Sequence, residues 1–320
     1  MNINLSTGKI GQKLYRFILP LLATSFINIT YGFVDMICIG RLGSGAVAAV
    51  GTCGFFLWFA NASASMAKIG TQVYVSQEYG KKNFKDARAY YQSAFLTNFA
   101  LGLLTGLVFF IFNSQIISFF NLGDEKIISQ ALIYFKVIAF SMPFMYANHV
   151  LSAFFNSIGN SRLTFLTNSF GLVFNIVFDI LLIFGIGIFP RLEVFGAALA
   201  TTLAHISVFI LLIFFNLRQD KNLRLSLEKL DIEKAKSVCK VGFPSAIQST
   251  LYCIYSIILA RIISYFGPVE IAVQKIGSQI ESISWMTADG FAIAATTFVG
   301  QNYGAKNYDR IRLVDRKSVV

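Results

Sequence analysis

Four acidic residues lie inside long apolar stretches of the chain, namely Asp35, Asp179, Glu281 and Asp289. A carboxylate at the centre of a membrane helix costs at least about 2.5–3.5 kcal/mol, so acids in such positions are usually functional. Asn175 precedes Asp179 by one helical turn and shares its face. Carboxylate and amide oxygens suit hard cations such as Na⁺, and two carboxylates in one dry site can instead share a proton.

Thr201 lies at a predicted depth similar to that of two of these acids. A helix rises about 1.5 Å per residue, so Asp35 and Asp179 lie roughly 27 and 24 Å beyond the starts of their apolar stretches. The stretch that contains Thr201 runs the opposite way, which puts its hydroxyl in the same layer of the membrane. We therefore predict one oxygen-rich site of Asp35, Asn175, Asp179 and Thr201 that holds Na⁺ or a proton. In the alternative interpretation, the two acids only bond neighbouring helices or touch water.

The elements that must position these residues are membrane-spanning helices. Hydrophobic residues make up 55% of the 320 residues and charged residues only 13%, about half the charged share of a soluble domain. A span needs about 20 apolar residues, and the first stretch lacks the small-residue cleavage site of a signal peptide. The predicted spans, eight in number, cover residues 17–39, 46–74, 92–112, 132–155, 163–188, 196–217, 241–266 and 271–300.

Basic residues are distributed unevenly between the two sides of these spans. Twenty of the 27 lysines and arginines lie in loops and ends on one side, and three lie on the other. Because cytoplasmic loops carry the excess of lysine and arginine, we predict a cytoplasmic N-terminus in a multi-pass protein of the plasma membrane. The net charge of +11 then requires no nucleic-acid partner. The basic segments are the N-terminus, 77–88, 156–162, 218–240 and 301–320, and the opposite loops hold Arg41, Lys126 and Arg191.

The chain repeats itself at an offset of 224 residues. Six of ten positions are identical between residues 75–84 and residues 299–308, and Pro20 matches Pro244 at the same offset. Six predicted spans separate the copies, so both copies cross the membrane in the same direction. Parallel repeats of this kind are common in transporters, where the substrate path lies between the two halves.

This repeat predicts an all-α integral membrane protein with two parallel six-helix bundles. Residues 1–217 would form the N-terminal bundle, 218–240 a cytoplasmic linker, and 241–320 the start of the C-terminal bundle. Two full copies of a 224-residue unit exceed the 320 residues of the chain. We therefore expect about eight of twelve helices here, with the C-terminal part of the second copy missing.

Other residues offer less specific chemistry. The four cysteines form no CxxC pair and are interpreted as packing residues. His149 and His205 are far apart in sequence, so we predict no metal site beyond Na⁺ at the acidic cluster. Trp58 and Trp285 are interpreted as lining or packing residues. The absence of HExxH and GxSxG motifs argues against an enzyme, and we expect no cofactor.

Several ordered motifs resemble those of multidrug and toxic compound extrusion (MATE) transporters, over nearly the whole chain. The resemblance implies twelve helices in two bundles and the export of cationic or amphipathic compounds in exchange for Na⁺ or H⁺. The motifs are Val34-Asp-Met-Ile-Cys-Ile-Gly-Arg-Leu-Gly43, Asn175-Ile-Val-Phe-Asp179, Phe195-Gly-Ala-Ala-Leu-Ala-Thr201 and Phe298-Val-Gly-Gln-Asn-Tyr-Gly304.

The resemblance also implies a coupling-ion site in the first bundle. The family uses an acid on the first helix, an Asn and an Asp on the fifth, and a Thr on the sixth, which Asp35, Asn175, Asp179 and Thr201 match. Thr202 is adjacent to the last of these. One subgroup carries a coupling Glu on the seventh helix, and residues 248–252 hold no acid. This argues against that subgroup's mechanism in the second bundle, or moves the role to other acids.

We therefore predict an ion-coupled antiporter, expected as a monomer in the bilayer, whose partner is a small-molecule substrate. The alternative is a lipid-linked oligosaccharide flippase of the related superfamily. Its cavity needs several basic residues to bind a pyrophosphate, and Arg261 and Lys275 are too few for this. A membrane enzyme and a passive channel have less support. Glu281 and Asp289 share a stretch with Lys275, so ion pairing or a polar channel wall explains them as well as a transport role does.

Overall fold

The computed structural model describes residues 3–120, 122, 124–226, 230–264 and 268–318, with the side chains at 257, 260–261, 264, 268–276, 279 and 315–318 left out. Within these residues the chain forms helices and no strand, as the apolar stretches predict. The helices are α1 Ile10–Gly40, α2 Ser44–Gly80, α3 Phe84–Ile111, α4 Asn113–Ser118, α5 Glu125–Ala139, α6 Met142–Ser157, α7 Ser161–Phe184, α8 Glu193–Leu217, α9 Ile232–Ser264, α10 Pro268–Gly304 and α11 Tyr308–Ser318.

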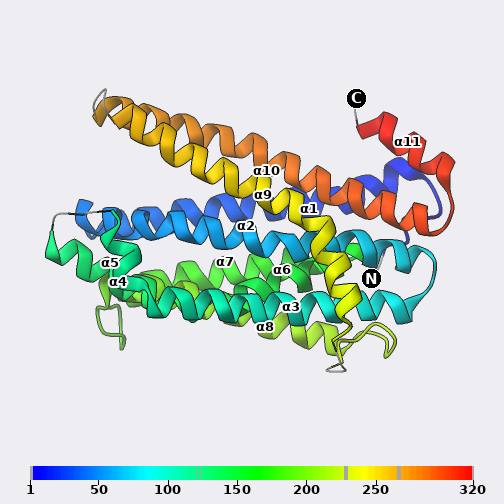
Figure 1. Ribbon diagram of the computed structural model, residues 1–320, viewed down its shortest axis with the longest axis horizontal. Coiled ribbons are helices and arrows are strands. Elements are labelled where there is room, and N and C mark those ends of the chain that lie inside the picture. The colour runs from blue at the N-terminus through cyan, green and yellow to red at the C-terminus, as the bar shows by residue number, and fades with distance from the viewer. Residues whose placement is uncertain (1–2, 121, 123, 227–229, 265–267, 319–320) are drawn as a thin grey trace.

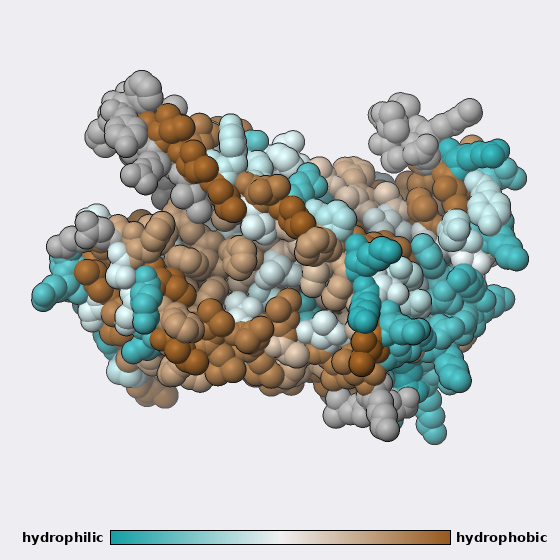
Figure 2. Space-filling model, viewed as in Figure 1, coloured by the Kyte–Doolittle hydropathy of each residue, from teal (hydrophilic) through white to brown (hydrophobic). Residues whose placement is uncertain are grey.

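Five helices of the described chain, α1, α2, α3, α7 and α8, are long and apolar enough to cross a membrane, or six if α5 and α6 form one bent span. Apolar side chains cover the middle of the molecule, and polar ones gather mostly at one end (Figure 2). An all-α, multi-pass membrane protein is therefore confirmed. The predicted seventh and eighth spans coincide with parts of α9 and α10, except that residues 265–266 lie outside the described residues. Neither helix meets this criterion over its described residues.

The predicted fourth span, 132–155, is not one straight helix. It is broken between α5 and α6, whose axes bend by 48°. Pro143 lies in the first turn of α6 and has no N–H to donate to the carbonyl four residues earlier, at Ala139. A proline also disfavours helical backbone in the preceding residue. The chain therefore leaves the helix after Ala139 and starts a new one at Met142.

Helix α9 begins within the segment predicted as a linker, 218–240. The Asp231 carboxylate accepts hydrogen bonds from the backbone N–H groups of Glu233 and Lys234, both at 3.1 Å. This is an N-terminal cap, which satisfies donors that the first helical turn leaves free. The cap starts the helix at Ile232, and residues 232–240 therefore belong to α9.

The two copies of the repeated decapeptide end their helices with the same turn. Lys82 follows α2 with φ 61°, and Lys306 follows α10 with φ 59°. The next residue donates its backbone N–H five positions back in each case, from Asn83 to Glu78 at 2.9 Å and from Asn307 to Asn302 at 2.8 Å. The left-handed backbone costs a non-glycine residue roughly 1–2 kcal/mol, and a lysine charge at a helix C-terminus offsets part of that cost.

The ends of α2 and α10 approach each other reciprocally. A Cβ on Gly80 would overlap the carbonyl oxygen of Gln301, and a Cβ on Gly304 would overlap the carbonyl oxygen of Gln77. Each glycine lies 224 residues from its counterpart, and so does each glutamine. The backbones can meet this closely only because both positions lack a side chain. We call this contact the glycine seam.

The N-terminal segment lies across the same end of the molecule (Figure 1). Leu5 is fully buried, and its backbone N–H donates to the side chain of Gln301 at 3.1 Å. The Gln301 amide in turn donates to the carbonyl of Ser157 at 2.7 Å. Arg310 donates to the carbonyl of Gly8 at 2.9 Å. These bonds tie α6, α10, α11 and the N-terminus together. We call this the basic end, because Lys81 and Lys82 after α2 and Lys306 after α10 lie there.

At the other end of the molecule, α9 and α10 stand away from the helices below them (Figure 1). Along their halves nearer the basic end, α9 packs on α2, and α10 packs on α1 and α2. The molecule is therefore closed at the basic end and open at the opposite one.

Candidate functional site

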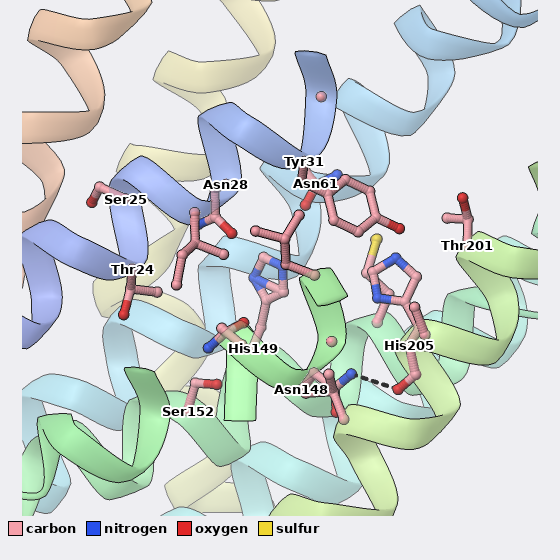
Figure 3. A pocket seen from close by; sticks show the side chains of 18 of the residues that line it. Thr24, Ser25, Asn28, Tyr31, Asn61, Asn148, His149, Ser152, Thr201 and His205 are labelled. Carbon is pink, nitrogen blue, oxygen red and sulfur yellow. Dashed lines mark hydrogen bonds between the residues drawn. The ribbon is translucent and has the colours of Figure 1, made fainter. Parts of the chain in front are cut away.

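A cavity of about 600 Å³ lies among α1, α2, α5, α6, α7, α8 and α10. Its wall mixes apolar and polar side chains, and Figure 3 shows hydroxyl, amide and imidazole groups of α1, α2, α6 and α8 around it. Asp35, Lys68 and Asp289 are the charged residues of the described lining. Both Asp35 and Thr201, two of the four residues predicted to form an ion site, line this cavity.

Asn175 and Asp179 lie behind the cavity wall, on the face of α7 that packs against α1 and α8. Both side chains are 0% exposed. Asp179 is close enough to Asp35 of α1 for their charges to interact. Asn175 and Asp179 share one face of α7 because they are four residues apart. This face places the Asp179 carboxylate near Asp35 of α1.

Several polar atoms of this group are buried without a hydrogen-bond partner in the described part of the chain. Among the described residues, no hydrogen bond reaches either oxygen of Asp179, the oxygen or nitrogen of the Asn175 amide, or the buried oxygen of Asp35. Buried polar atoms in proteins nearly always have a partner, so such exceptions indicate an ion, a proton or water. Carboxylate and amide oxygens are the donor set that a hard cation takes.

Thr201 and Thr202 point in different directions. The Thr202 hydroxyl donates to the carbonyl of Ala198 in its own helix at 2.8 Å and reaches Val137 of α5 at 3.4 Å. Thr201 faces the cavity, where the phenol of Tyr31 points towards it (Figure 3). Thr201 is therefore the threonine that the cavity makes accessible to an ion.

Sequence reasoning missed Tyr31, although a signal for it was present. Tyr31 lies four residues before Asp35, so the two share one face of α1. Its hydroxyl lies near the charges of both Asp35 and Asp179. We call Asp35, Asn175, Asp179 and Thr201 the acid cluster. The phenol of Tyr31 supplies one more oxygen beside it.

Both histidines of the chain line the same cavity, despite their distance in sequence (Figure 3). His149 lies within electrostatic range of His205 and of Lys68. The side chain of Asn148 donates to the backbone carbonyl of His205 at 2.9 Å. No group of three or more His, Cys, Asp or Glu side chains suited to a metal occurs in the described part of the chain.

Two acids of α10, Glu281 and Asp289, have partners that the sequence did not indicate. The Lys68 ammonium of α2 lies 3.5 Å from the Asp289 carboxylate. Glu281 accepts a hydrogen bond of 2.9 Å from the indole of Trp285. The predicted partner of both acids, Lys275, has a side chain outside the described set.

The family model named MatE matches the chain over residues 20–181 and again over 244–320. The two matches start 224 residues apart, which equals the offset of the repeat.

Individual relatives show the same similarity. The chain is 28% identical over 322 residues to "Probable multidrug resistance protein YoeA" of Bacillus subtilis, covering 98% of this chain and 69% of that protein. It is 28% identical over 311 residues to "Probable multidrug resistance protein NorM" of Thermotoga maritima, covering 97% and 67%. The chain thus spans about two thirds of the length of these relatives.

Solved structures share the fold. The structure titled "Outward-facing conformation of a multidrug resistance MATE family transporter of the MOP superfamily" superposes with a TM-score of 0.86 at 22% identity, covering 99% of this chain and 70% of the other. "Crystal structure of MATE in complex with MaD5" superposes with a TM-score of 0.90 at 20% identity, covering 99% and 72%.

Proposed function

The chain belongs to the MatE family of membrane transporters, and on that basis we propose that it exports cationic or amphipathic compounds from the cytoplasm in exchange for Na⁺ or H⁺. The observation that supports ion coupling most directly is the acid cluster. Asp179 and Asn175 are fully buried there without partners among the described residues, and Asp179 lies within electrostatic range of Asp35. An uncompensated buried carboxylate is unstable unless a cation or a proton neutralises it.

The proposed mechanism is alternating access. The basic end faces the cytoplasm under the positive-inside rule, because it carries Lys81, Lys82 and Lys306. In this conformation the glycine seam and the N-terminal segment close that end. Substrate and ion would occupy the cavity in alternation, and the ion would bind most tightly to the conformation whose basic end is open. Ion binding at the acid cluster would then drive return to the other conformation, because a ligand shifts an equilibrium by its differential affinity.

The charges of the cavity support an exporter of cations over the flippase alternative. A pyrophosphate needs several cationic side chains, whereas the described lining holds one, Lys68, which Asp289 pairs. The side chains of Arg261 and Lys275 lie outside the described set. Two parallel six-helix bundles are proposed on the 224-residue offset of the two MatE matches and on the reciprocal seam.

Transport in proteoliposomes tests this function. The protein expressed from its natural gene is reconstituted, and uptake of radiolabelled tetraphenylphosphonium is followed under an imposed Na⁺ or pH gradient. Valinomycin and equal K⁺ hold the membrane potential at zero, because a potential alone would move this cation. We expect uptake driven by one of the two gradients, and that gradient identifies the coupling ion. Uptake equal to protein-free vesicles under both gradients would count against the proposal.

The two adjacent threonines give a matched pair of variants. We expect Thr201→Val to raise the concentration of coupling ion needed for half-maximal transport at least tenfold, since it removes an oxygen from the acid cluster. Thr202→Val should leave this ion dependence within twofold, because the Thr202 hydroxyl bonds backbone carbonyls of α5 and α8. The measurement is the initial rate against ion concentration. Equal changes in both variants would show that Thr201 has no special role.

A further inference from the structure

Three aromatic side chains meet beside the cavity, at the junction of α2, α9 and α10. The ring centroid of Tyr252 lies 5.8 Å from that of Trp58 and 5.6 Å from that of Trp285. Their side chains are 39%, 40% and 56% exposed for Trp58, Tyr252 and Trp285. Rings this exposed do not form a packed core, and their faces remain available to another molecule.

A carboxylate completes this aromatic group. The indole N–H of Trp285 donates to one oxygen of Glu281 at 2.9 Å, which holds the exposed carboxylate next to the rings and leaves its second oxygen available. We call Trp58, Tyr252, Trp285 and Glu281 the aromatic site.

The aromatic site continues the wall of the cavity. Glu281, Trp285 and Asp289 follow one another at intervals of four residues, so they lie along one face of α10. Asp289 lines the cavity, and so do Leu57 and Met286, the sequence neighbours of the two tryptophans. The aromatic site therefore borders the cavity on the side where α2 faces α10.

We propose that the aromatic site binds the cationic group of the exported compound, in the form of a delocalised or alkylated organic cation. This inference rests on the proposed function, and it assigns the substrate class to particular side chains. An organic cation over the face of Trp or Tyr gains about 0.5–2 kcal/mol from each ring, with Trp the strongest. The carboxylate of Glu281 supplies the opposite charge, which a neutral compound of the same shape cannot use.

The site draws on helices that a change of conformation would separate. Trp58 is on α2, whereas Tyr252 and Trp285 are on α9 and α10. A movement of α9 and α10 relative to α2 would take the rings apart and lower the affinity for the cation. Affinity that differs between conformations is what alternating access requires of a substrate site.

The chain is well suited to a direct test, because its two tryptophans both belong to the aromatic site. Tetraphenylphosphonium is titrated into the purified protein while tryptophan fluorescence is followed, and the neutral triphenylphosphine oxide serves as the matched compound. We expect saturable quenching by the cation and at least tenfold weaker binding of the neutral compound. Glu281→Gln should weaken cation binding about tenfold and leave binding of the neutral compound unchanged, because glutamine keeps an acceptor for Trp285 and loses only the charge.

Further variants separate this site from general effects. Trp285→Leu should weaken binding at least tenfold, with Trp58 as the remaining reporter. The matched controls are Phe291→Leu, an exposed ring elsewhere on α10, and Glu125→Gln, an exposed acid at the start of α5; both should bind as the unmodified protein does. Non-saturable quenching, equal quenching by both compounds, or an unchanged affinity in Glu281→Gln would overturn the site.

Transport by the same samples distinguishes the two proposals. Ion-driven tetraphenylphosphonium uptake with unchanged affinity in Glu281→Gln and Trp285→Leu would overturn the aromatic site and leave the exporter in place. Saturable, charge-selective binding without ion-driven uptake would support the aromatic site and contradict the exporter.

Discussion

Asp179→Asn should reduce ion-driven uptake of tetraphenylphosphonium to the level of protein-free vesicles, while the variant still inserts and purifies normally. Asp179 is fully buried, and neither carboxylate oxygen has a protein partner among the described residues. An amide of the same size carries no charge, so it neither attracts Na⁺ nor takes up a proton at ordinary pH. The variant therefore loses the ion without losing the shape of α7.

Thermal stability separates this role from a structural one. Removing an unpaired buried charge does not destabilise a protein, so Asp179→Asn should unfold at the same temperature as the unmodified protein or higher. An ion at about a hundred times its Kd stabilises the state that binds it by about 2.7 kcal/mol. If Na⁺ is the coupling ion, the unmodified protein should therefore gain stability with added Na⁺, and Asp179→Asn should not.

Asp124→Asn is the matched control, since Asp124 is an exposed acid that caps the start of α5 and asparagine caps equally well. It should transport and unfold like the unmodified protein. Normal ion-driven uptake by Asp179→Asn would remove the acid cluster from the mechanism. Loss of uptake together with a lower unfolding temperature would indicate a structural role instead.

Gly80→Ala should open the glycine seam at the basic end and strongly impair transport. The added methyl would overlap the carbonyl oxygen of Gln301, and a backbone atom cannot move aside as a flexible side chain does. Such overpacking costs about 1–3 kcal/mol, which shifts an equilibrium between two conformations roughly 5- to 150-fold. Gly304→Ala should have a comparable effect, because it meets the carbonyl of Gln77 in the reciprocal contact.

Cysteine labelling at the basic end measures this opening. Ser157 is fully buried there, so Ser157→Cys in a background without the native cysteines reports exposure to a water-soluble maleimide. We expect labelling at least five times faster when Gly80→Ala is added. Gly51→Ala and Gly54→Ala are matched controls in the same helix, since a Cβ at either position meets no atom within 4 Å. Equal labelling rates in all these variants would show that the seam does not close the basic end.

Much of the acid cluster follows from local geometry alone. Asn175 and Asp179 are one turn apart, and any helix over this segment puts them on one face. Counting residues from the ends of apolar stretches placed Asp35 and Thr201 at a matching depth, because every helix has the same rise. The structure brings Asp35 and Asp179 within electrostatic range, although their role in ion coupling stays a prediction.

Other features depend on which faces of separate helices meet. Adjacent residues point about 100° apart on a helix, so only the packing of α8 against α5 turns Thr202 to the backbone and leaves Thr201 in the cavity. His149 and His205 were interpreted separately, yet both line one cavity. The partner of Asp289 is Lys68 of α2, which is far away in sequence. Spacing along α10 instead suggests Lys275.

The sequence by itself determined that this protein is an all-helical membrane protein with an internal repeat, because apolar length, the repeated segment and the i, i+4 spacing of polar residues are properties of single segments. Its motifs also resemble those of MATE transporters. It did not determine the break after Ala139 or the meeting of Trp58, Tyr252 and Trp285. These were decided only in the tertiary structure, because a side chain's neighbours depend on how helices far apart in the chain are rotated and crossed. The residues of the acid cluster can therefore be predicted from the sequence, whereas the aromatic site can be found only from the tertiary structure.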